Sequence, residues 1–330
     1  MSLPGISIVF VHYKTPQLLL NAIDSVVEYT KGCNYEIIVV DNYSQDDSQK
    51  MITDKHPHVR WFSHSYNAGF ARGNNLGISL AKFDYVLIIN SDILLREDAI
   101  SKSFEKYCEL EKIYPIGLFG CKIISFEGQT LPSVHNHHTT IFSLLKKNAF
   151  WIKLFGEKSN RIYNASWYNT NHFAEHLSGA FLLFNKKRLN QKDLLLDEDF
   201  FLYYEDVEWC LRLYKKGFRH FYFAETYILH KDSGSTTVNI IKQRQILVSE
   251  LLFIYKCYPR WYFILYYHLM IFNLNLDNFL EKRRFGITSN VLERKKIAQL
   301  ISKTSKLILS CYKRVPSASM QMLKYEHTIN

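Results

Sequence analysis

Residues 36–42 read Glu-Ile-Ile-Val-Val-Asp-Asn, a short apolar run that ends in an acid and an amide. A run of this length, rich in Ile and Val and bounded by polar residues, is typical of a strand buried on both faces. Amphipathic stretches at residues 18–27, 48–53 and 70–80 alternate with runs of this kind. The alternation predicts a parallel, Rossmann-like sheet with flanking helices. The other three runs are Ile6–Val11, Val59–Phe62 and Tyr85–Ile89.

Polar residues follow three of these predicted strands. They are His12-Tyr13, Asp41-Asn42 and Asn90-Ser91-Asp92. Ligands of open α/β sheets bind at the carboxyl ends of the strands. We therefore expect the three clusters to meet at one rim of the sheet and to form a binding site there.

An acidic and aromatic stretch, residues 198–212, changes its apolar period where two carboxylates meet. A bulky run at residues 200–204 precedes them, and apolar residues then recur at helical spacing until Gly217. The pattern predicts a helix that begins near Glu205 and Asp206. Carboxylates at such a junction project from a fixed position, so these two are the first catalytic candidates.

Seven segments in this order resemble the family 2 glycosyltransferases, particularly the rhamnosyltransferase-like branch. The resemblance extends over roughly residues 5–237 and implies a GT-A fold with an inverting transfer from a nucleotide-sugar donor. The segments are residues 6–13, residues 36–44, residues 67–75, Asn90-Ser91-Asp92, Ser178-Gly179-Ala180, Glu205-Asp206, and His230 with Gly234-Ser235-Thr236.

The resemblance implies that Asp92 and His230 bind a divalent cation, Mn²⁺ or Mg²⁺, which stabilises the diphosphate leaving group. Asn90 departs from the family's Asp-x-Asp element, which leaves one charged ligand there and predicts weaker metal affinity. Two alternatives stay open. Ser91 or Asp92 suits the N-cap of a helix over residues 93–100, and a lone His after a strand is often only a satisfied polar residue.

The donor-side candidates are polar groups at or near the expected rim. Asp41 matches the base-reading position of the family, although a capping box with Asn42 and Ser44 is the alternative. A surface role is the alternative for Arg72. Gly69, Gly73 and Gly77 are spaced four apart and predict close packing of a helix on the sheet. The nucleotide-sugar-binding set is His12, Tyr13, Asp41, Asn67, Arg72, Asn90 and Ser91.

Asp206 is the predicted general base, because inverting transfer needs a carboxylate to take the proton of the acceptor hydroxyl. Glu205 either orients Asp206 or meets the acceptor, and the alternative for Asp206 is a helix cap. Ser178 and Gly179 are placed on the acceptor side. The irregular stretch at residues 127–171 is interpreted as the wall of the acceptor site. Its histidines, His135, His137 and His138, are expected to be solvent-exposed or on the acceptor side.

The charge is concentrated at one end of the chain. Residues 231–330 hold 16 Lys and Arg against 6 Asp and Glu, while residues 1–230 hold 25 of each. We predict a catalytic domain at residues 1–237, with a nucleotide-sugar half near 1–125 and an acceptor half near 126–237. A basic helical region follows at residues 238–330. Its excess of positive charge indicates an anionic partner.

The C-terminal region contains an uncharged aromatic stretch, residues 261–276, with basic residues on both sides. As a helix it would be about 24 Å long, shorter than the ~30 Å hydrocarbon core of a bilayer. A transmembrane helix is therefore not expected. Either the stretch binds an anionic membrane surface, or it packs as a buried helix or in a homo-oligomer.

Six scattered cysteines without a C-x-x-C pair, and no visible signal peptide, favour a cytoplasmic location, at the inner face of the membrane if the basic region binds lipid. The expected acceptor is a saccharide or lipid-linked oligosaccharide of a bacterial surface polysaccharide, and the expected donor is dTDP-rhamnose or a UDP-sugar. One alternative function is a sugar-phosphate nucleotidyltransferase, although no glycine-rich loop follows the first strand. The other is a non-catalytic nucleic-acid-binding protein, but no recognition motif supports it, and no nucleic acid partner is expected.

Overall fold

The computed structural model describes residues 4–135, 165–231 and 240–285, with the single positions 140, 141, 144, 295, 298 and 299. Contacts between residues divide the chain into two compact units. The first comprises residues 1–138, 163–201 and 205–234, and the second comprises 139–162, 202–204 and 235–330. His137, His138 and the Gly234-Ser235-Thr236 motif lie outside the described residues.

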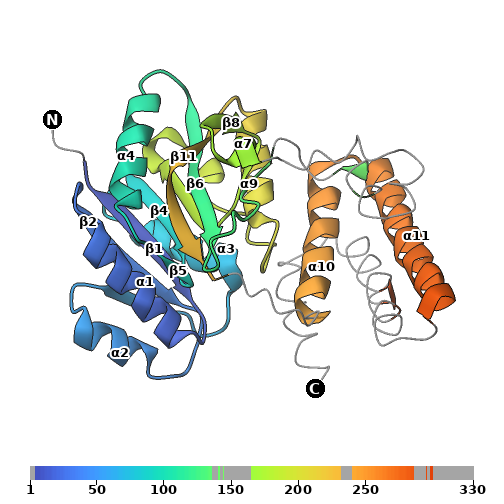
Figure 1. Ribbon diagram of the computed structural model, residues 1–330, viewed down its shortest axis with the longest axis horizontal. Helices are drawn as coiled ribbons and strands as arrows, with labels where there is room; N and C mark the ends of the chain where they lie inside the picture. Colours follow the sequence, from blue (N-terminus) through green and yellow to red (C-terminus); the bar gives the residue numbers. More distant parts are fainter. Residues whose placement is uncertain are drawn as a thin grey trace. The chain divides into compact units, whose positions relative to one another are not determined.

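The first unit begins with four parallel strands in the order β3-β2-β1-β4 (Figure 1). Their register aligns His12 with Asp41, and Val11 with Asn90. The polar clusters therefore lie at the same end of neighbouring strands, as the sequence predicted. The strands are β1 (Ile6–His12), β2 (Tyr35–Asp41), β3 (Arg60–Ser63) and β4 (Tyr85–Asn90).

The sheet continues beyond β4 in the order β10-β6-β11-β5, and β8 pairs with β11. β10 is antiparallel to both of its neighbours, whereas β6 and β11 are parallel. In the described part of the chain the sheet has nine strands and is mainly parallel, which confirms the predicted fold class. The added strands are β10 (Phe181–Asn185), β6 (Ile116–Ser125), β11 (Arg219–His230), β5 (Ile93–Leu94) and β8 (His172–Ala174).

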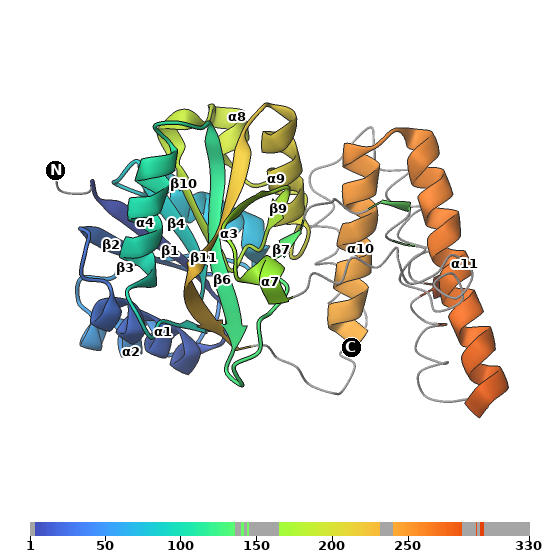
Figure 2. The same ribbon diagram turned by 45° about the horizontal axis from the view of Figure 1, so that its top comes forward.

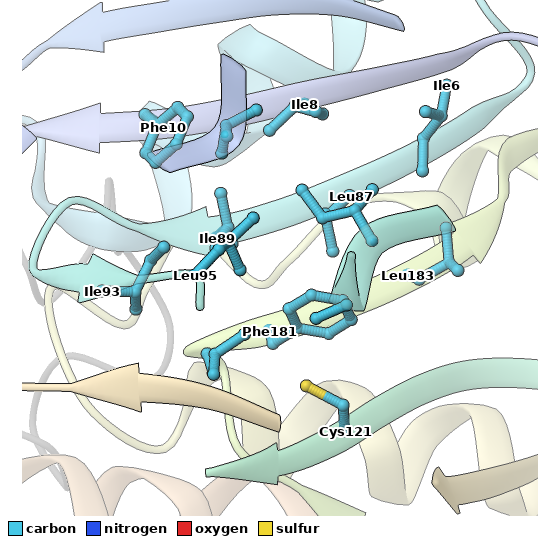
Figure 3. Close-up of a cluster of buried hydrophobic side chains, with 14 of the residues drawn as sticks. Ile6, Ile8, Phe10, Leu87, Ile89, Ile93, Leu95, Cys121, Phe181 and Leu183 are labelled. Atoms are coloured by element: carbon cyan, nitrogen blue, oxygen red, sulfur yellow. The ribbon is translucent and has the colours of Figure 1, made fainter. Parts of the chain in front are cut away.

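Helices cover both faces of the sheet, and each face has its own hydrophobic core. One core joins α1 (Pro16–Tyr29), α2 (Ser48–Lys55) and α4 (Ala99–Leu110) to side chains such as Ile8 and Phe10 of β1 (Figure 3). The other joins α3 (Gly69–Leu80) and α9 (Glu205–Lys215) to Val9, Ile38 and Val40. Side chains of β1 alternate between the two cores because successive residues of a strand point to opposite faces.

Glycines of α3 allow the helix to approach β1, as predicted for two of the three. A Cβ atom added at Gly77 would lie 2.2 Å from Val9 Cγ1, and one added at Gly73 would lie 2.8 Å from Val11 Cγ1. Gly69 instead lies against the carbonyl of Phe201 and has a φ of +79°, a conformation that glycine adopts without strain. The Phe70 N–H donates to that carbonyl, which fixes the start of α3.

The helix expected at residues 93–100 begins later than predicted. Ile93 and Leu94 form the strand β5, and α4 starts at Ala99. Its N-cap is Asp98, whose carboxylate accepts from the Ser101 N–H at 3.0 Å. The alternative in which Ser91 or Asp92 caps this helix is therefore wrong, and both residues lie in the turn before β5.

The second unit contains the helical hairpin α10 (Ile240–Cys257) and α11 (Arg260–Phe285), whose helices pack side by side (Figure 2). Phe253, Ile254, Phe263 and Met270 are among its buried side chains, and the buried Tyr266 hydroxyl donates to Glu250. Among the described helices, none combines the length and the apolar character that crossing a membrane requires.

The remaining short elements belong to the first unit. They are β7 (Val134–His135), β9 (His176–Leu177), α7 (Ala165–Tyr168), α8 (Gln191–Leu194) and the 3₁₀ helix η2 (Lys186–Arg188).

Candidate active site

Asn90, Asp92 and His230 meet at the carboxyl rim of the sheet although 140 residues separate the first from the last. Asn90 ends β4, Asp92 follows in the next turn, and His230 ends β11. The antiparallel pairing of β5 with β11 sets His230 opposite Ile93 and so beside Asp92. His230 Nε2 lies 3.2 Å from Asp92 Oδ1 and 3.2 Å from Asn90 Nδ2. Ser91 lies half-buried in the same turn.

The three side chains carry groups that can bind a divalent cation. His230 Nε2 cannot donate a proton to Asp92 and accept one from the Asn90 amide at the same time. With the Asn90 amide rotated, the possible ligands are the imidazole nitrogen, the Asp92 carboxylate and the amide oxygen. Cis ligands of an octahedral ion with bonds of about 2.1 Å lie about 3 Å apart, which matches these separations. Both side chains remain partly exposed, at 22% for His230 and 32% for Asp92.

The side chains that could bind the metal carry little negative charge. No group of three or more His, Cys, Asp and Glu side chains in the described residues is arranged to hold a metal ion. The cluster at the rim has one carboxylate, one imidazole and one amide. Imidazole with carboxylate suits Mn²⁺ better than an all-oxygen site does. The weaker metal affinity expected from the amide in place of a second carboxylate stays a prediction.

Asp206 lies in the first turn of α9 and is held by backbone hydrogen bonds from two sides. Its Oδ2 accepts from the Gly179 N–H at 2.8 Å, and its Oδ1 accepts from the Val207 N–H at 2.8 Å. Burial raises the pKa of the Asp206 carboxyl, but His176 and these two N–H groups lower it by more. Asp206 is therefore ionised at neutral pH, as a proton acceptor must be. It contributes more than a helix cap, because it joins α9 to the turn before β10.

Glu205 has the opposite environment, although it is the adjacent residue. It is buried at 4% exposure, and its Oε2 has no hydrogen-bond partner among the described residues. Burial raises the pKa of the Glu205 carboxyl, and the negative charge of Asp206 raises it further, well above the usual range. The pKa values of the two adjacent carboxyls are therefore shifted in opposite directions.

His176 is a residue of the site that the sequence did not reveal. It lies in β9, its Nε2 is 3.6 Å from Asp206 Oδ2, and its ring stacks on that of His135 at 5.5 Å. The pairing of the two-residue strands β7 and β9 places the two rings together. His135 is thus joined through His176 to Asp206, and its expected place on the acceptor side stays a prediction.

A short chain of contacts joins Asp206 to the cluster at the rim. The Asn90 N–H donates to the Ala180 carbonyl at 3.2 Å, and the neighbouring Gly179 N–H donates to Asp206. Ser178 supports this turn, since its Oγ accepts from the Ala180 N–H at 3.3 Å. A Cβ atom at Gly179 would lie 3.4 Å from Asp206 Oδ2, so a side chain at this position would crowd the carboxylate.

The donor-side candidates at the ends of β1 and β2 have different exposures. His12 is fully buried, with its Nε2 2.9 Å from Ser48 Oγ, and burial lowers the pKa of its imidazole against the opposing influence of Asp41 and Asp46. His12 therefore lies inside the protein at the end of β1 that belongs to the rim. The Asp41 carboxylate accepts from the Ser44 N–H at 3.2 Å, within the loop before α2. The N-cap position of α2 is Asp47, so Asp41 does not cap that helix. Tyr13 is 42% exposed.

Asn67 and Arg72 organise the start of α3. Asn67 Oδ1 accepts from the Gly69 N–H at 3.2 Å. The Arg72 side chain is only 15% exposed, which excludes the solvated surface position, and its Nε lies 3.5 Å from Glu198. The Asn42 amide, which the sequence left unassigned, donates to the Gly69 carbonyl at 2.9 Å and connects the end of β2 to this helix.

A family model described as glycosyl transferase family 2 matches residues 7–175, about half of the chain, which includes β2, β3, β4 and most of β1 but neither β11 nor α9. The chain belongs to this family. The membership favours a sugar transferase over a nucleotidyltransferase and over a protein that only binds nucleic acid.

Two relatives of the family 2 chain extend the comparison. A glycosyltransferase of Streptococcus pneumoniae serotype 4, GlyG, is 32% identical over 117 residues, which are 34% of this chain and 38% of that protein. The hexosyltransferase Agl10 of low-salt glycan biosynthesis in Haloferax volcanii is 24% identical over 214 residues, 64% of this chain and 62% of Agl10. The chain thus spans less than two thirds of each of these relatives.

One solved structure agrees with the fold. The mannosyltransferase PcManGT of Pyrobaculum calidifontis, in complex with GDP-Man and Mn²⁺, matches 99% of this chain and 80% of its own, with a TM-score of 0.53 and 11% identity. An identity this low supports the GT-A fold and no statement about substrate.

Proposed function

We propose that this family 2 chain is an inverting, metal-dependent glycosyltransferase with Asp206 as its general base. The observation that carries the proposal is the chain of contacts Asn90–Ala180–Gly179–Asp206, which connects a cation-binding cluster to an ionised carboxylate. Transfer with inversion needs a charge-stabilising group at the leaving diphosphate and a base on the opposite side of the anomeric carbon.

Asp206 takes the proton of the acceptor hydroxyl as that oxygen attacks the anomeric carbon. The backbone N–H groups of Gly179 and Val207 hold both carboxylate oxygens, so the base is already oriented when the acceptor arrives. The raised pKa of Glu205 disfavours a second negative charge next to the base. Ser178 and Gly179, in the turn that contacts Asp206, are proposed to face the acceptor.

Asn90, Asp92 and His230 would hold Mn²⁺ or Mg²⁺, and the bound ion would neutralise charge that develops on the diphosphate. Tyr13, Asp41, Asn67, Arg72 and Ser91 are proposed to surround the nucleotide and its diphosphate, with His12 beneath them. The Arg72 side chain, which is 15% exposed, is the cation nearest in the chain to Asn67. The Mn²⁺ in the PcManGT complex supports a divalent cation.

The proposed donor is dTDP-rhamnose or a UDP-sugar, and the proposed acceptor is a saccharide or lipid-linked oligosaccharide. The glycan-biosynthesis role in the name of Agl10 supports a surface polysaccharide as the product. We place the reaction on the cytoplasmic side of a bacterial membrane, where a lipid-linked acceptor and a cytosolic nucleotide sugar meet. The domain division at residue 237 is part of this proposal.

The test combines a donor screen with binding of nucleoside diphosphates. Purified protein is given dTDP-, UDP- and GDP-sugars with and without Mn²⁺, and release of the nucleoside diphosphate is measured. Calorimetric titration of the matching diphosphate then compares the wild type with Asp92→Ala and His230→Ala. Each variant is expected to lose the gain in affinity that Mn²⁺ provides, because both residues are assigned to one ion.

Asp54→Ala is the matched control, since Asp54 is an exposed carboxylate on α2 away from the rim. It removes the same charge and is expected to keep the full Mn²⁺ effect. A wild-type protein that hydrolyses none of the donors in either condition would contradict the proposed activity. A variant at Asp92 or His230 that retains the Mn²⁺ effect would remove that residue from the metal site.

A further inference from the structure

The exposed residues of α11 lie along one stripe of the helix. Positions 261, 264, 265, 268, 272, 275 and 279 are exposed, at intervals of three and four residues that keep them on one face. Five of these seven are large apolar side chains. Their exposed fractions are 65% for Trp261, 41% for Ile264, 44% for Leu265, 50% for Phe272 and 61% for Phe279. These five residues are called the exposed stripe below.

The opposite face of α11 is already used within the second unit. Phe263, Tyr266 and Met270 are buried, as are Asn273 and Asn278. Tyr266 donates to Glu250 of α10, which fixes the rotation of α11 about its own axis. The exposed stripe lies on the face of α11 away from these buried residues, and exposed apolar surface of this kind marks an interaction site.

Basic residues stand at both ends of the exposed stripe. Lys256 and Arg260 precede it, and Lys282 and Arg283 continue the same three-and-four spacing beyond Phe279; all four are exposed. Asp277 is the single acid in the sequence from 256 to 280. From Trp261 to Phe279 the helix rises about 27 Å. The result is a long apolar stripe with positive charge at each end.

We propose that the exposed stripe is the face by which the protein binds an anionic lipid surface, with α11 lying parallel to the membrane. Trp and Phe rings settle at the depth of the headgroups, and Lys and Arg pair with anionic lipid. A helix with cations at both ends satisfies both of them only if it lies flat. The proposal deepens the proposed membrane location and does not depend on the transfer reaction.

The charges favour lipid over a second copy of the chain. If two α11 helices paired antiparallel through the exposed stripe, Lys282 and Arg283 of one would meet Arg260 of the other. If they paired parallel, each cationic end would meet its own counterpart. Like charges that face each other across an interface oppose association, whereas anionic headgroups complement both ends at once. The surplus of +10 carried by residues 231–330 acts in the same direction.

The experiment is co-sedimentation of the full chain with vesicles of phosphatidylcholine alone or mixed with phosphatidylglycerol, at low and high salt. The wild type is expected to bind the anionic vesicles at low salt and to lose most of this binding at high salt. Trp261→Ser combined with Phe279→Ser is expected to reduce the partition coefficient at least about tenfold. Lys282→Gln and Arg283→Gln are each expected to reduce it about fivefold, on anionic vesicles only.

Ile113→Ser is the matched control, because Ile113 is apolar, 72% exposed and located in the first unit. It is expected to bind vesicles as the wild type does. Equal binding to neutral vesicles, or no binding at low salt, would overturn the proposal. So would a wild-type dimer that Trp261→Ser with Phe279→Ser converts to a monomer while vesicle binding is unchanged. Nucleotide release measured on the same samples without vesicles tests the proposed transfer separately.

Discussion

Glu205 and Asp206 are neighbours in the sequence whose carboxyl pKa values are shifted in opposite directions. Asp206 accepts from two backbone N–H groups and lies beside His176, whereas Glu205 is buried with one oxygen lacking a partner among the described residues. When environments push the pKa values of two adjacent acids apart, the acids can take different roles. In the proposal Asp206 is the base, and the raised pKa of Glu205 favours the uncharged form of that neighbour.

Replacing Asp206 by Asn tests this assignment. Asp206→Asn keeps the shape and the contact with Gly179 but cannot take a proton, so sugar transfer is expected to fall at least about 100-fold. Nucleoside diphosphate binding with Mn²⁺ is expected to stay within about twofold of the wild type, because the carboxylate is not a metal ligand in the proposal. Transfer rates and calorimetry on one preparation measure both. Near-normal turnover would move the base to another residue, with Glu205 the next candidate.

His220 makes the stability of the first unit sensitive to pH. It is fully buried, its Nδ1 accepts from the Leu118 N–H at 3.2 Å, and its Nε2 lies 2.8 Å from the Cys210 carbonyl. Burial lowers the pKa of His220 to about 4, from 6.5. The unfolded chain thus binds a proton between these values while the folded chain does not, so stability falls as pH falls from 6.5 toward 4. The full loss is about 3 kcal/mol.

Urea unfolding between pH 7 and pH 4.5 measures this dependence. His220→Gln is expected to be less stable than the wild type at pH 7, because glutamine reproduces the two hydrogen bonds of the imidazole with poorer geometry. Its free energy of unfolding is expected to fall less steeply with decreasing pH, since unfolding of the variant takes up nearly one proton fewer. His58→Gln, at an exposed histidine, is the control and is expected to follow the wild type. If the pH slope of His220→Gln equals that of the wild type, another group carries the acid sensitivity.

Single residues could be predicted from the sequence where a known motif contains them and the register of the strands brings them together. Asp92 and His230 were paired in advance, and the structure sets them 3.2 Å apart. Whether they bind metal stays a prediction. His176 could not be found, because its position beside Asp206 depends on the pairing of two strands of two residues each, too short to leave a periodic signal. The burial of His12 was equally invisible, since a polar residue at a strand end is ordinarily exposed.

At the scale of elements, the four parallel strands β1 to β4 were predicted from the sequence, whereas β5, β6, β8, β10 and β11 were not. β1, β2 and β4 are buried apolar runs that can be recognised locally, and β3 was predicted although none of its four residues is buried. β5 has two residues and exists because it pairs with Leu229 and His230, far away in the sequence. The delayed start of α4 did have a local signal: Asp98 followed three residues later by Ser101 has the spacing of an N-cap and its N3 residue.

The close packing of α3 on β1 predicts whether Gly77→Ala stabilises or destabilises the protein. By helix propensity alone, Gly77→Ala within a helix should stabilise the protein by about 1 kcal/mol. A Cβ atom there would lie 2.2 Å from Val9 Cγ1, in a fully buried strand, and a β-branched side chain has little freedom to turn away. We therefore expect Gly77→Ala to destabilise by about 1–3 kcal/mol, as overpacked cores do.

A double-mutant cycle separates the contact from other effects. Val9→Ala opens the space that the added methyl group needs, so Gly77→Ala is expected to be less damaging in that background than in the wild type. Ser79→Ala, at an exposed position of the same helix, controls for propensity and is expected to be neutral or stabilising. The midpoints of urea unfolding, compared at a constant m-value, give the stability changes of Gly77→Ala, Val9→Ala, the double variant and Ser79→Ala. Stabilisation by Gly77→Ala in the wild-type background would contradict the close packing.

The chain divides into two compact units, and the second takes in residues 139–162 and 202–204 as well as residues 235–330. The predicted division at residue 237 stays a prediction about folding and ligand binding. In the proposal, nucleotide and metal bind within residues 1–237, so they stabilise that part by mass action, by about 2.7 kcal/mol at a ligand concentration 100 times the Kd. The helical hairpin α10–α11 contains none of the proposed ligand contacts.

Calorimetry of the full chain is expected to resolve two unfolding transitions, of which nucleoside diphosphate with Mn²⁺ raises only one. Tyr266→Phe is expected to lower the midpoint of the other transition, because it removes the buried hydroxyl that donates to Glu250 in the second unit. Leaving a buried acceptor without this donor costs about 1–3 kcal/mol. Gly77→Ala marks the ligand-sensitive transition in the same way. If Tyr266→Phe and the ligand shift one and the same transition, the two units unfold together and the division at residue 237 is not a boundary of stability.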